Sequence, residues 1–183
     1  MILYVVRHGE SVTNMQKKYG GSIDTPLTEK GLEQARELTE KLAGMKFDII
    51  VSSSLTRARQ TAEIINEKLN LPLIFSDEFK ERNLGVYEGL TQEEIIEKYP
   101  DLWERRCTRQ MDDAPTNGET IRQFDTRITN ALLKLEKEYP EKNVLLVSHG
   151  FALRTINRHY KNLSFDEMRD FSLGNCEIVK YVV

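Results

Sequence analysis

Two short apolar runs near opposite ends of the chain each finish in a histidine that is followed by glycine. Residues 2–6 lead into Arg7-His8-Gly9, and residues 144–147 lead into Ser148-His149-Gly150. Aliphatic and β-branched runs of this length are typical of buried strands. Ligands bind at the carboxyl ends of strands in open α/β sheets. Two strands that deliver a histidine to the same edge therefore predict one site with two imidazoles.

The remaining pattern alternates strands with helices. Apolar residues at three- and four-residue spacing predict helices between Thr28 and Gly44 and over about 55–69, 119–138 and 151–159, and apolar runs predict strands at 48–52, 73–75 and 178–183. This order predicts an α/β fold, a three-layer α/β/α sandwich whose mostly parallel central sheet has helices on both faces. We expect a single domain over residues 1–183. Residues about 76–117 have no clear period apart from a helix near 91–98, and we expect them to form a lid insertion over the sheet.

The composition of the chain bears on which partners the protein binds and in which cellular compartment it works. A formal net charge of −3, from 26 basic and 29 acidic residues, gives no reason to expect nucleic acid or a membrane surface as a partner. No apolar stretch approaches the ~20 residues that span a bilayer, and the first run is too short for a secretory signal. Cys107 and Cys176 form no CxxC pair or disulfide framework, which fits a reducing cytosol. We expect a soluble, cytoplasmic protein.

Basic side chains concentrate near the predicted strand ends. Arg7 precedes His8, and Arg57 stands in the first turn of the helix after the second strand, which residues 52–54, all serine, can cap. Guanidinium groups offer phosphate oxygens a planar, permanently charged set of donors, and helix N-termini also attract anions. A single arginine or histidine is more often structural, so the predicted phosphate site depends on their coincidence. His159 lacks this context, and we interpret it as structural.

Four sequence blocks follow one another in a fixed order. They are Arg7-His8-Gly9-Glu10 with Asn14; Asp24-x-Pro26-Leu27-Thr28-x-x-Gly31; Ser53-x-Leu55-x-Arg57-Ala58-x-x-Thr61-Ala62; and Ser148-His149-Gly150. Together they resemble the histidine phosphatase superfamily, which includes the cofactor-dependent phosphoglycerate mutases. The resemblance runs from residue 2 to the last strand and is weakest over 89–117. Arg-His-Gly alone is a weak signal, whereas the four blocks in this order are specific.

The resemblance implies covalent catalysis by a histidine. His8 would attack phosphorus and carry a transient phosphohistidine, while its other ring nitrogen would bond an acceptor such as a nearby backbone carbonyl. Arg7, Arg57 and His149 would surround the phosphoryl oxygens and stabilise the charge that spreads over them. These cations would do what Mg²⁺ does in other phosphoryl-transfer enzymes, so we expect neither a metal nor a cofactor.

The leaving alkoxide also needs a proton, which in the family comes from a carboxylic acid after the third strand. Glu81 matches that position, and Glu88 is the competing candidate. Asn14, the Gly20-Gly21 turn and Gly150 match positions that in the family contact phosphate or shape the pocket.

The lid decides between a phosphatase and a mutase. The resemblance implies that mutases hold their substrate with a Tyr three positions after the acid and a Lys further on, where this chain has Leu84 and about Gln92. Arg105 and Arg106 resemble part of a mutase Trp-Arg-Arg stretch, with one residue interposed, and are candidate lid contacts to a substrate anion. The later segment Pro115-x-x-Gly118-Glu119-Thr120-x-x-x-Phe124-x-x-Arg127 is similar to that of short, phosphatase-type members.

We therefore predict a metal-independent phosphomonoester hydrolase that acts through a phosphohistidine on a small phosphorylated metabolite. The alternative is a phosphoglycerate mutase dependent on 2,3-bisphosphoglycerate. A non-catalytic phospho-ligand-binding module is less favoured, because such members typically lack the first histidine or the acid and this chain keeps His8 and Glu81. Apolar residues on the last strand would serve either a core or a homodimer.

Overall fold

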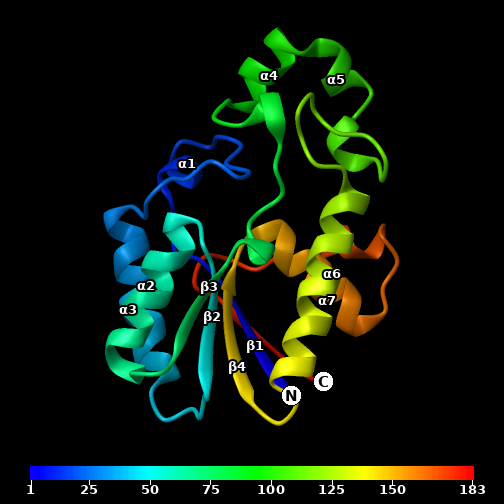
Figure 1. Ribbon diagram of the computed structural model, residues 1–183. Helices are drawn as coiled ribbons and strands as arrows, with labels where there is room; N and C mark the ends of the chain where they lie inside the picture. The colour runs from blue at the N-terminus through cyan, green and yellow to red at the C-terminus, as the bar shows by residue number, and fades with distance from the viewer.

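The computed structural model describes residues 1–183, which form one five-stranded sheet in the order β3-β2-β4-β1-β5 (Figure 1). The strands are β1 (Ile2–Arg7), β2 (Ile49–Ser53), β3 (Leu73–Ser76), β4 (Asn143–Ser148) and β5 (Ile178–Val182). The first four run parallel, and β5 pairs antiparallel with β1. Because Arg7 pairs with Ser148 at the ends of β1 and β4, the two predicted histidines emerge side by side.

Helices cover both faces of the sheet, so the predicted three-layer α/β/α sandwich is confirmed (Figure 1). One face packs against α2 (Glu29–Leu42) and α3 (Thr56–Leu69), with Leu38 and Ala62 meeting Ile50 and Leu145 of the sheet. The other face packs against α6 (Ile121–Glu138) and α7 (Gly150–Lys161). None of the helices has the length and hydropathy needed to cross a membrane.

The lid segment, residues 76–117, lies beyond the carboxyl edge of the sheet, where α4 and α5 project in Figure 1. Its elements are the 3-10 helices η1 (Asp77–Phe79), η2 (Gly85–Tyr87) and η3 (Cys107–Arg109) and the helices α4 (Gln92–Lys98) and α5 (Pro100–Glu104). The lid segment has a small apolar cluster of its own, formed by Tyr87, Ile95 and Cys107. The helix expected near 91–98 is present. The helices α5 and α1 (Val12–Met15) were not predicted, because four or five residues are too few to show a helical period.

The N-terminus of α3 is capped differently from the sequence prediction. No serine of residues 52–54 caps it, because the N-cap position falls on Leu55, which has no side-chain oxygen. Asp24 supplies the cap from a distant loop, since its carboxylate accepts hydrogen bonds from Thr56 N at 2.6 Å and from Thr56 Oγ1 at 2.9 Å. The cap therefore fastens the loop after α1 to the helical turn that carries Arg57.

The loop after β1 is fixed by a close contact between two glycines. A Cβ on Gly9 would lie 2.4 Å from Gly31 O, and a Cβ on Gly31 would lie 2.1 Å from Glu10 O. Only glycine allows this approach. The first turn of α2 thus presses directly on the backbone that follows His8.

Candidate active site

His8 lies at the end of β1 with only 3% of its surface exposed. Its backbone N–H donates to Ser148 O, and its carbonyl accepts from Asn175 Nδ2 at 2.8 Å. Its ring Nδ1 is 2.6 Å from Gly9 O. A carbonyl can only accept, so Nδ1 carries the proton and Nε2 keeps its lone pair. The backbone carbonyl predicted to fix this tautomer is confirmed.

The surroundings of His8 keep its imidazole neutral. Burial is the main cause that lowers the pKa of His8 well below its usual value, and the positive charges of Arg57 and Arg7 lower it further. Burial and then Arg57 lower the pKa of His149 in the same way. A neutral imidazole with a free Nε2 lone pair is the form that can act as a nucleophile.

His149 follows β4 and is completely buried. Its ring lies 5.1 Å from the His8 ring, measured between centroids. Its Nδ1 accepts from Arg57 Nε at 3.2 Å, so its Nε2 carries the proton and donates to Ser53 Oγ at 2.7 Å. Both ring nitrogens of His149 therefore already form hydrogen bonds. His149 can donate to a phosphoryl oxygen only if its Nε2–H group gives up the hydrogen bond to Ser53.

Arg57 and Arg7 are anchored through backbone carbonyls. Arg57 Nη1 donates to Ile23 O at 2.6 Å and Nη2 donates to Gly21 O at 2.7 Å. Arg7 Nη1 donates to Leu173 O at 2.8 Å, while its Nε is buried without any hydrogen-bond acceptor. Buried donors are seldom left without an acceptor, so the free Arg7 Nε points to an anion that binds there.

Glu81 lies close to these cations and to the start of α7. Burial lowers the pKa of Arg7 and of Arg57, and the Glu81 carboxylate is the largest influence in the opposite direction on both. Its two oxygens accept from Arg82 N at 2.9 Å and from Phe151 N at 3.0 Å. Two backbone N–H groups thus hold the Glu81 carboxyl group in the neighbourhood of Arg7 and Arg57.

Glu88, the competing acid, is occupied by a structural task. One of its oxygens, Oε1, accepts from Ser22 N at 2.6 Å, from Ser22 Oγ at 2.9 Å and from Leu84 N at 2.9 Å. The carboxylate therefore joins the loop after α1 to η2. The geometry favours Glu81 over Glu88 as the proton donor.

The remaining expected phosphate-site residues surround the same centre. Gly21 has a φ of +46°, and a Cβ there would lie 2.2 Å from Glu88 Oε1, so the turn requires glycine. Gly20 and Gly21 border a cavity at this centre. A Cβ on Gly150 would lie 3.6 Å from Arg7 Cζ, an ordinary contact, so Gly150 backs the guanidinium. Asn14 Oδ1 accepts from Ser11 N and Asn175 Nδ2, which leaves its own amide N–H groups to donate.

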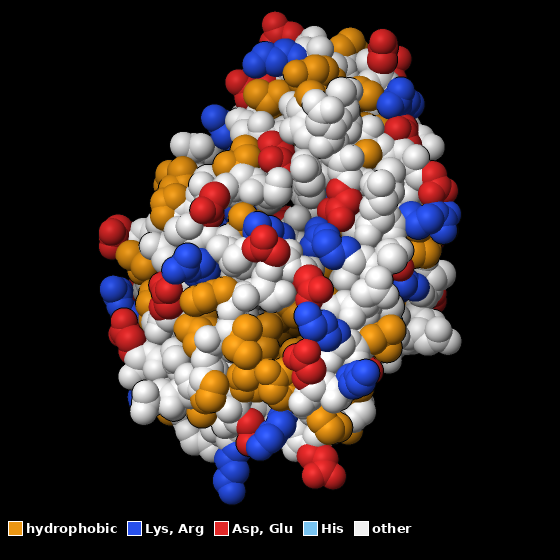
Figure 2. Space-filling model, in the orientation of Figure 1, with side chains coloured by type: hydrophobic (Ala, Val, Ile, Leu, Met, Phe, Trp, Pro, Cys, Tyr) orange, Lys and Arg blue, Asp and Glu red, His pale blue; other side chains and the backbone are white.

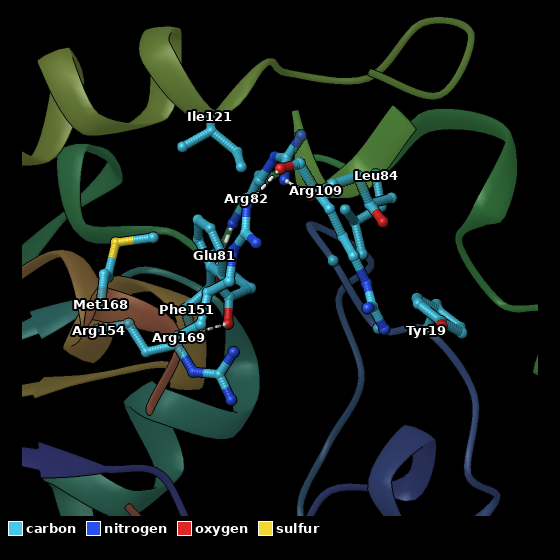
Figure 3. Close-up of a pocket in the computed structure, with 13 residues that line it drawn as sticks. Tyr19, Glu81, Arg82, Leu84, Arg109, Ile121, Phe151, Arg154, Met168 and Arg169 are labelled. Carbon is cyan, nitrogen blue, oxygen red and sulfur yellow. Dashed lines mark hydrogen bonds between the residues drawn. The ribbon is translucent and has the colours of Figure 1, made fainter. Parts of the chain in front are cut away.

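A cavity of about 530 Å³ adjoins Glu81 beneath the lid segment (Figure 3). On the face seen in Figure 2, charged side chains gather between the lid segment and an apolar patch lower on the molecule. The residues that line the cavity are Tyr19, Gly20, Gly21, Glu81, Arg82, Leu84, Thr108, Arg109, Ile121, Phe151, Arg154, Met168 and Arg169. Its size suits a metabolite larger than phosphate itself. No three His, Cys, Asp or Glu side chains are grouped so as to hold a metal ion.

The structure does not place Arg105 and Arg106 in this cavity. Arg105 is exposed and forms an ion pair with Asp113 at 2.9 Å. Arg106 has a left-handed backbone, φ 53°, and with Trp103 lines a second cavity of about 370 Å³, which shares Thr108 and Arg109 with the first. The turn at Arg106 sends the chain back, so Arg109 is the η3 arginine that reaches the cavity beside Glu81.

Three residues at the site were not singled out from the sequence. Arg154 lies one helical turn beyond Gly150, a spacing that could have placed it near the N-terminus of the same helix. Arg169, in the 3-10 helix η4 (Glu167–Asp170), and Asn175 reach the site from the segment before β5. Nothing local in the sequence marks either of them.

The chain is similar to known proteins in sequence and in fold. A family model described as "Histidine phosphatase superfamily (branch 1)" matches residues 3–183. The uncharacterized phosphatase PhoE of Bacillus subtilis is 42% identical over 152 residues, which are 83% of this chain and 73% of that protein. The 2,3-bisphosphoglycerate-dependent phosphoglycerate mutase 2 of Gloeobacter violaceus is 32% identical over 187 residues, covering 98% of this chain and 84% of that protein. The crystal structure of the alpha-ribazole phosphatase from Shigella flexneri superimposes with a TM-score of 0.92 at 28% identity, covering 98% of this chain and 89% of that one.

Proposed function

Because the chain belongs to the histidine phosphatase superfamily, we propose that it hydrolyses phosphate monoesters of small metabolites through a phosphohistidine at His8, without a metal ion. The observation that carries this proposal is the state of His8, whose buried, neutral ring has Nδ1 held by Gly9 O and Nε2 free. Arg7 and Arg57 stand beside it as permanent cations. A nucleophile next to two cations that form no direct ion pair suits a dianionic phosphoryl group.

In the first step, His8 Nε2 attacks phosphorus in line with the ester oxygen. The N–P bond forms as the P–O bond breaks, and the protonated Glu81 gives its proton to the departing alkoxide. Arg7 and Arg57 stabilise the negative charge on the phosphoryl oxygens during the transfer. His149 Nδ1 holds Arg57 in place. When the Nε2–H group of His149 gives up its hydrogen bond to Ser53, it donates to a phosphoryl oxygen instead.

In the second step, water enters on the side that the alcohol has left. Glu81, now a carboxylate, accepts a proton from water as its oxygen attacks phosphorus, and the N–P bond breaks. Inorganic phosphate leaves, and His8 returns to the neutral form that its surroundings favour. The proposal includes a cytoplasmic location, for which cysteine usage is the support, and no nucleic-acid partner, for which the net charge is the support. A homodimer stays a prediction.

A phosphoglycerate mutase dependent on 2,3-bisphosphoglycerate is the second candidate. The observation in its favour is the mutase-named relative that aligns with 98% of this chain. Against it, Leu84 lines the cavity at the position where the family resemblance implies a substrate-binding tyrosine. A leucine offers no hydrogen bond to a phosphoglycerate.

Phosphate release in the presence of EDTA tests the proposal. Purified wild type, His8→Ala and the control His159→Ala are assayed with 4-nitrophenyl phosphate and a panel of alkyl phosphomonoesters. The same proteins are incubated with 3-phosphoglycerate, with and without 2,3-bisphosphoglycerate. We expect chelator-resistant hydrolysis that disappears in His8→Ala and persists in His159→Ala, together with an acid-labile, alkali-stable phosphoprotein in wild type.

Two results would overturn the proposal. Isomerisation of 3-phosphoglycerate without net phosphate release would identify a mutase. Binding of phosphomonoesters without turnover, unchanged in His8→Ala, would identify a binding module.

A further inference from the structure

The cavity beside Glu81 carries more positive charge than a single phosphoryl group requires. Four arginines line it, Arg82, Arg109, Arg154 and Arg169, and Glu81 is the only acidic residue among the lining side chains. These arginines are separate from Arg7 and Arg57, which serve the phosphoryl group. The excess of cations indicates a second anionic group on the ligand.

The cavity arginines are not neutralised by the protein. Arg82, Arg109 and Arg154 have no carboxylate within ion-pair distance, and Arg169 has only the exposed Asp166 at 3.4 Å. Outside the cavity, and apart from Arg7 and Arg57 at the phosphoryl site, every arginine except Arg106 forms an ion pair with a carboxylate. Unpaired guanidinium groups gathered in one cavity favour an anion from solution.

Arg154 brings this excess close to the reaction centre. Arg154 lies one helical turn beyond Gly150, which contacts the Arg7 guanidinium, and its positive charge lowers the pKa of Arg7. Arg82 contributes a further unsatisfied donor, since its Nη2 is buried without an acceptor. An anion that binds among like charges relieves their mutual repulsion.

Backbone contacts fix the lid arginine in place. Arg82 Nη1 donates to Thr108 O at 2.8 Å, and Arg169 Nη2 donates to Arg109 O at 2.7 Å. The two hydrogen bonds tie the η3 turn to the body of the molecule. Arg169 therefore acts on the cavity partly by positioning Arg109.

Most of the remaining side chains in the cavity wall are apolar. These are Tyr19, Leu84, Ile121, Phe151 and Met168, with Met168 and Tyr19 on opposite sides in the view of Figure 3. Such a wall suits an apolar or aromatic body that joins the two charged ends of a ligand.

We propose that the preferred substrates are phosphomonoesters whose alcohol part carries a second anionic group on an apolar or aromatic body, and that Arg109 and Arg154 bind that group. This inference rests on the proposed function and names the substrate class of the same site. A carboxylate and a non-ester phosphonate share the anionic oxygens that a guanidinium recognises. A charge-assisted hydrogen bond of this kind corresponds to a preference of about tenfold or more in kcat/KM.

Three aryl phosphates that differ only in the para substituent test the inference. They are 4-carboxyphenyl phosphate, 4-phosphonophenyl phosphate and the neutral 4-carbamoylphenyl phosphate. The measured quantity is the ratio of kcat/KM for each charged ester to that for the neutral ester. The proteins are wild type, Arg109→Gln, Arg154→Gln, their double variant, Arg169→Gln, Arg169→Lys, and Arg36→Gln, an exposed control that removes one arginine charge from α2.

We expect wild type and Arg36→Gln to prefer at least one charged ester by about tenfold. Each of Arg109→Gln and Arg154→Gln should lose part of that ratio, and the double variant should bring it near one. Arg169→Gln should lower the ratio and Arg169→Lys should restore it, because lysine can still donate to Arg109 O. A structural defect would instead lower turnover of all three esters together.

Failure of the inference is distinguishable from failure of the proposed function. Equal kcat/KM for the three esters in wild type, with hydrolysis still dependent on His8, would overturn the inference alone. A preference that survives in the double variant would also overturn it. No hydrolysis of any ester, or hydrolysis that persists in His8→Ala, would overturn the proposed function.

Discussion

Acidification should destabilise this protein from about pH 6.5 downward, because two histidines are buried in neutral form. Burial and the Arg57 charge lower the pKa of His8 and of His149 well below 6.5 in the folded state. In the unfolded chain both imidazoles bind a proton near pH 6.5. Below that pH the unfolded state binds more protons than the folded state, so the free energy of unfolding falls as the pH falls. The stability is complete above pH 6.5 and is lost towards the depressed folded pKa values.

The magnitude follows from the linkage relation. A histidine that is protonated only when unfolded costs about 1.4 kcal/mol for each pH unit well below 6.5. Between pH 8 and pH 5 this amounts to about 2 kcal/mol for His8 and about 4 kcal/mol for His8 and His149 together. That is a large part of the ~5–15 kcal/mol that stabilises a typical domain.

Urea unfolding at half-unit pH steps from 5.0 to 8.0 measures this loss. The buffers must be free of phosphate, because a bound anion would stabilise the folded state and mask the slope. His8→Asn should lose about 2 kcal/mol less than wild type over this range, whereas His159→Gln, which keeps both buried imidazoles, should retain the wild-type loss. Equal pH dependence in wild type and His8→Asn would refute the reasoning, since His8 would then not be buried in neutral form.

Four further predictions concern the acid Glu81, its competitor Glu88 and the loop after α1, which contains Gly21 and Asp24. Glu81→Gln should lower kcat for alkyl phosphates by about 10²–10⁴-fold and for 4-nitrophenyl phosphate much less, since nitrophenolate leaves without a proton; equal losses in steady-state assays would argue against a general acid. Glu88→Gln should leave the difference between alkyl and 4-nitrophenyl phosphates as it is in wild type. Gly21→Ala, at a φ of +46°, should lower the free energy of unfolding, measured in urea, by about 1–2 kcal/mol or more. Asp24→Ala should cost about 0.5–2 kcal/mol in the same assay, because Thr56 N loses its cap, and an unchanged midpoint would contradict that role.

The sequence was sufficient for the part of the site that strand ends create. Two apolar runs predicted β1 and β4, and the parallel pairing of Arg7 with Ser148 places His8 and His149 side by side as expected. The second strand delivers Arg57 to the same edge, because β2 is the other neighbour of β4. These placements follow from local periodicity and from one general rule about sheets, so the sequence alone predicts them.

Contacts between distant segments were beyond such reasoning. Asp24 caps α3 from a loop that lies 32 residues earlier, in place of the nearby serines. Arg109 and Arg169 meet across 60 residues, through a hydrogen bond to a backbone carbonyl that no side-chain pattern records. The resemblance predicted lid arginines at positions 105 and 106, but the chain turns back at the left-handed Arg106, and Arg109 lines the cavity instead.

The way in which the arginines are anchored explains how the site keeps its charge for the substrate. A guanidinium has five N–H donors. Arg57 gives three of them to His149 Nδ1 and to two backbone carbonyls, and Arg7 gives one to a carbonyl, so both are fixed without a carboxylate that would cancel their charge. Arg82 is held in the same way by two carbonyls. By contrast, Arg158 of α7 is neutralised by Asp125 of the neighbouring helix α6. Because these partners are neutral, Arg7 and Arg57 keep their positive charge beside His8. That charge lowers the pKa of His8, and it also attracts an anionic substrate.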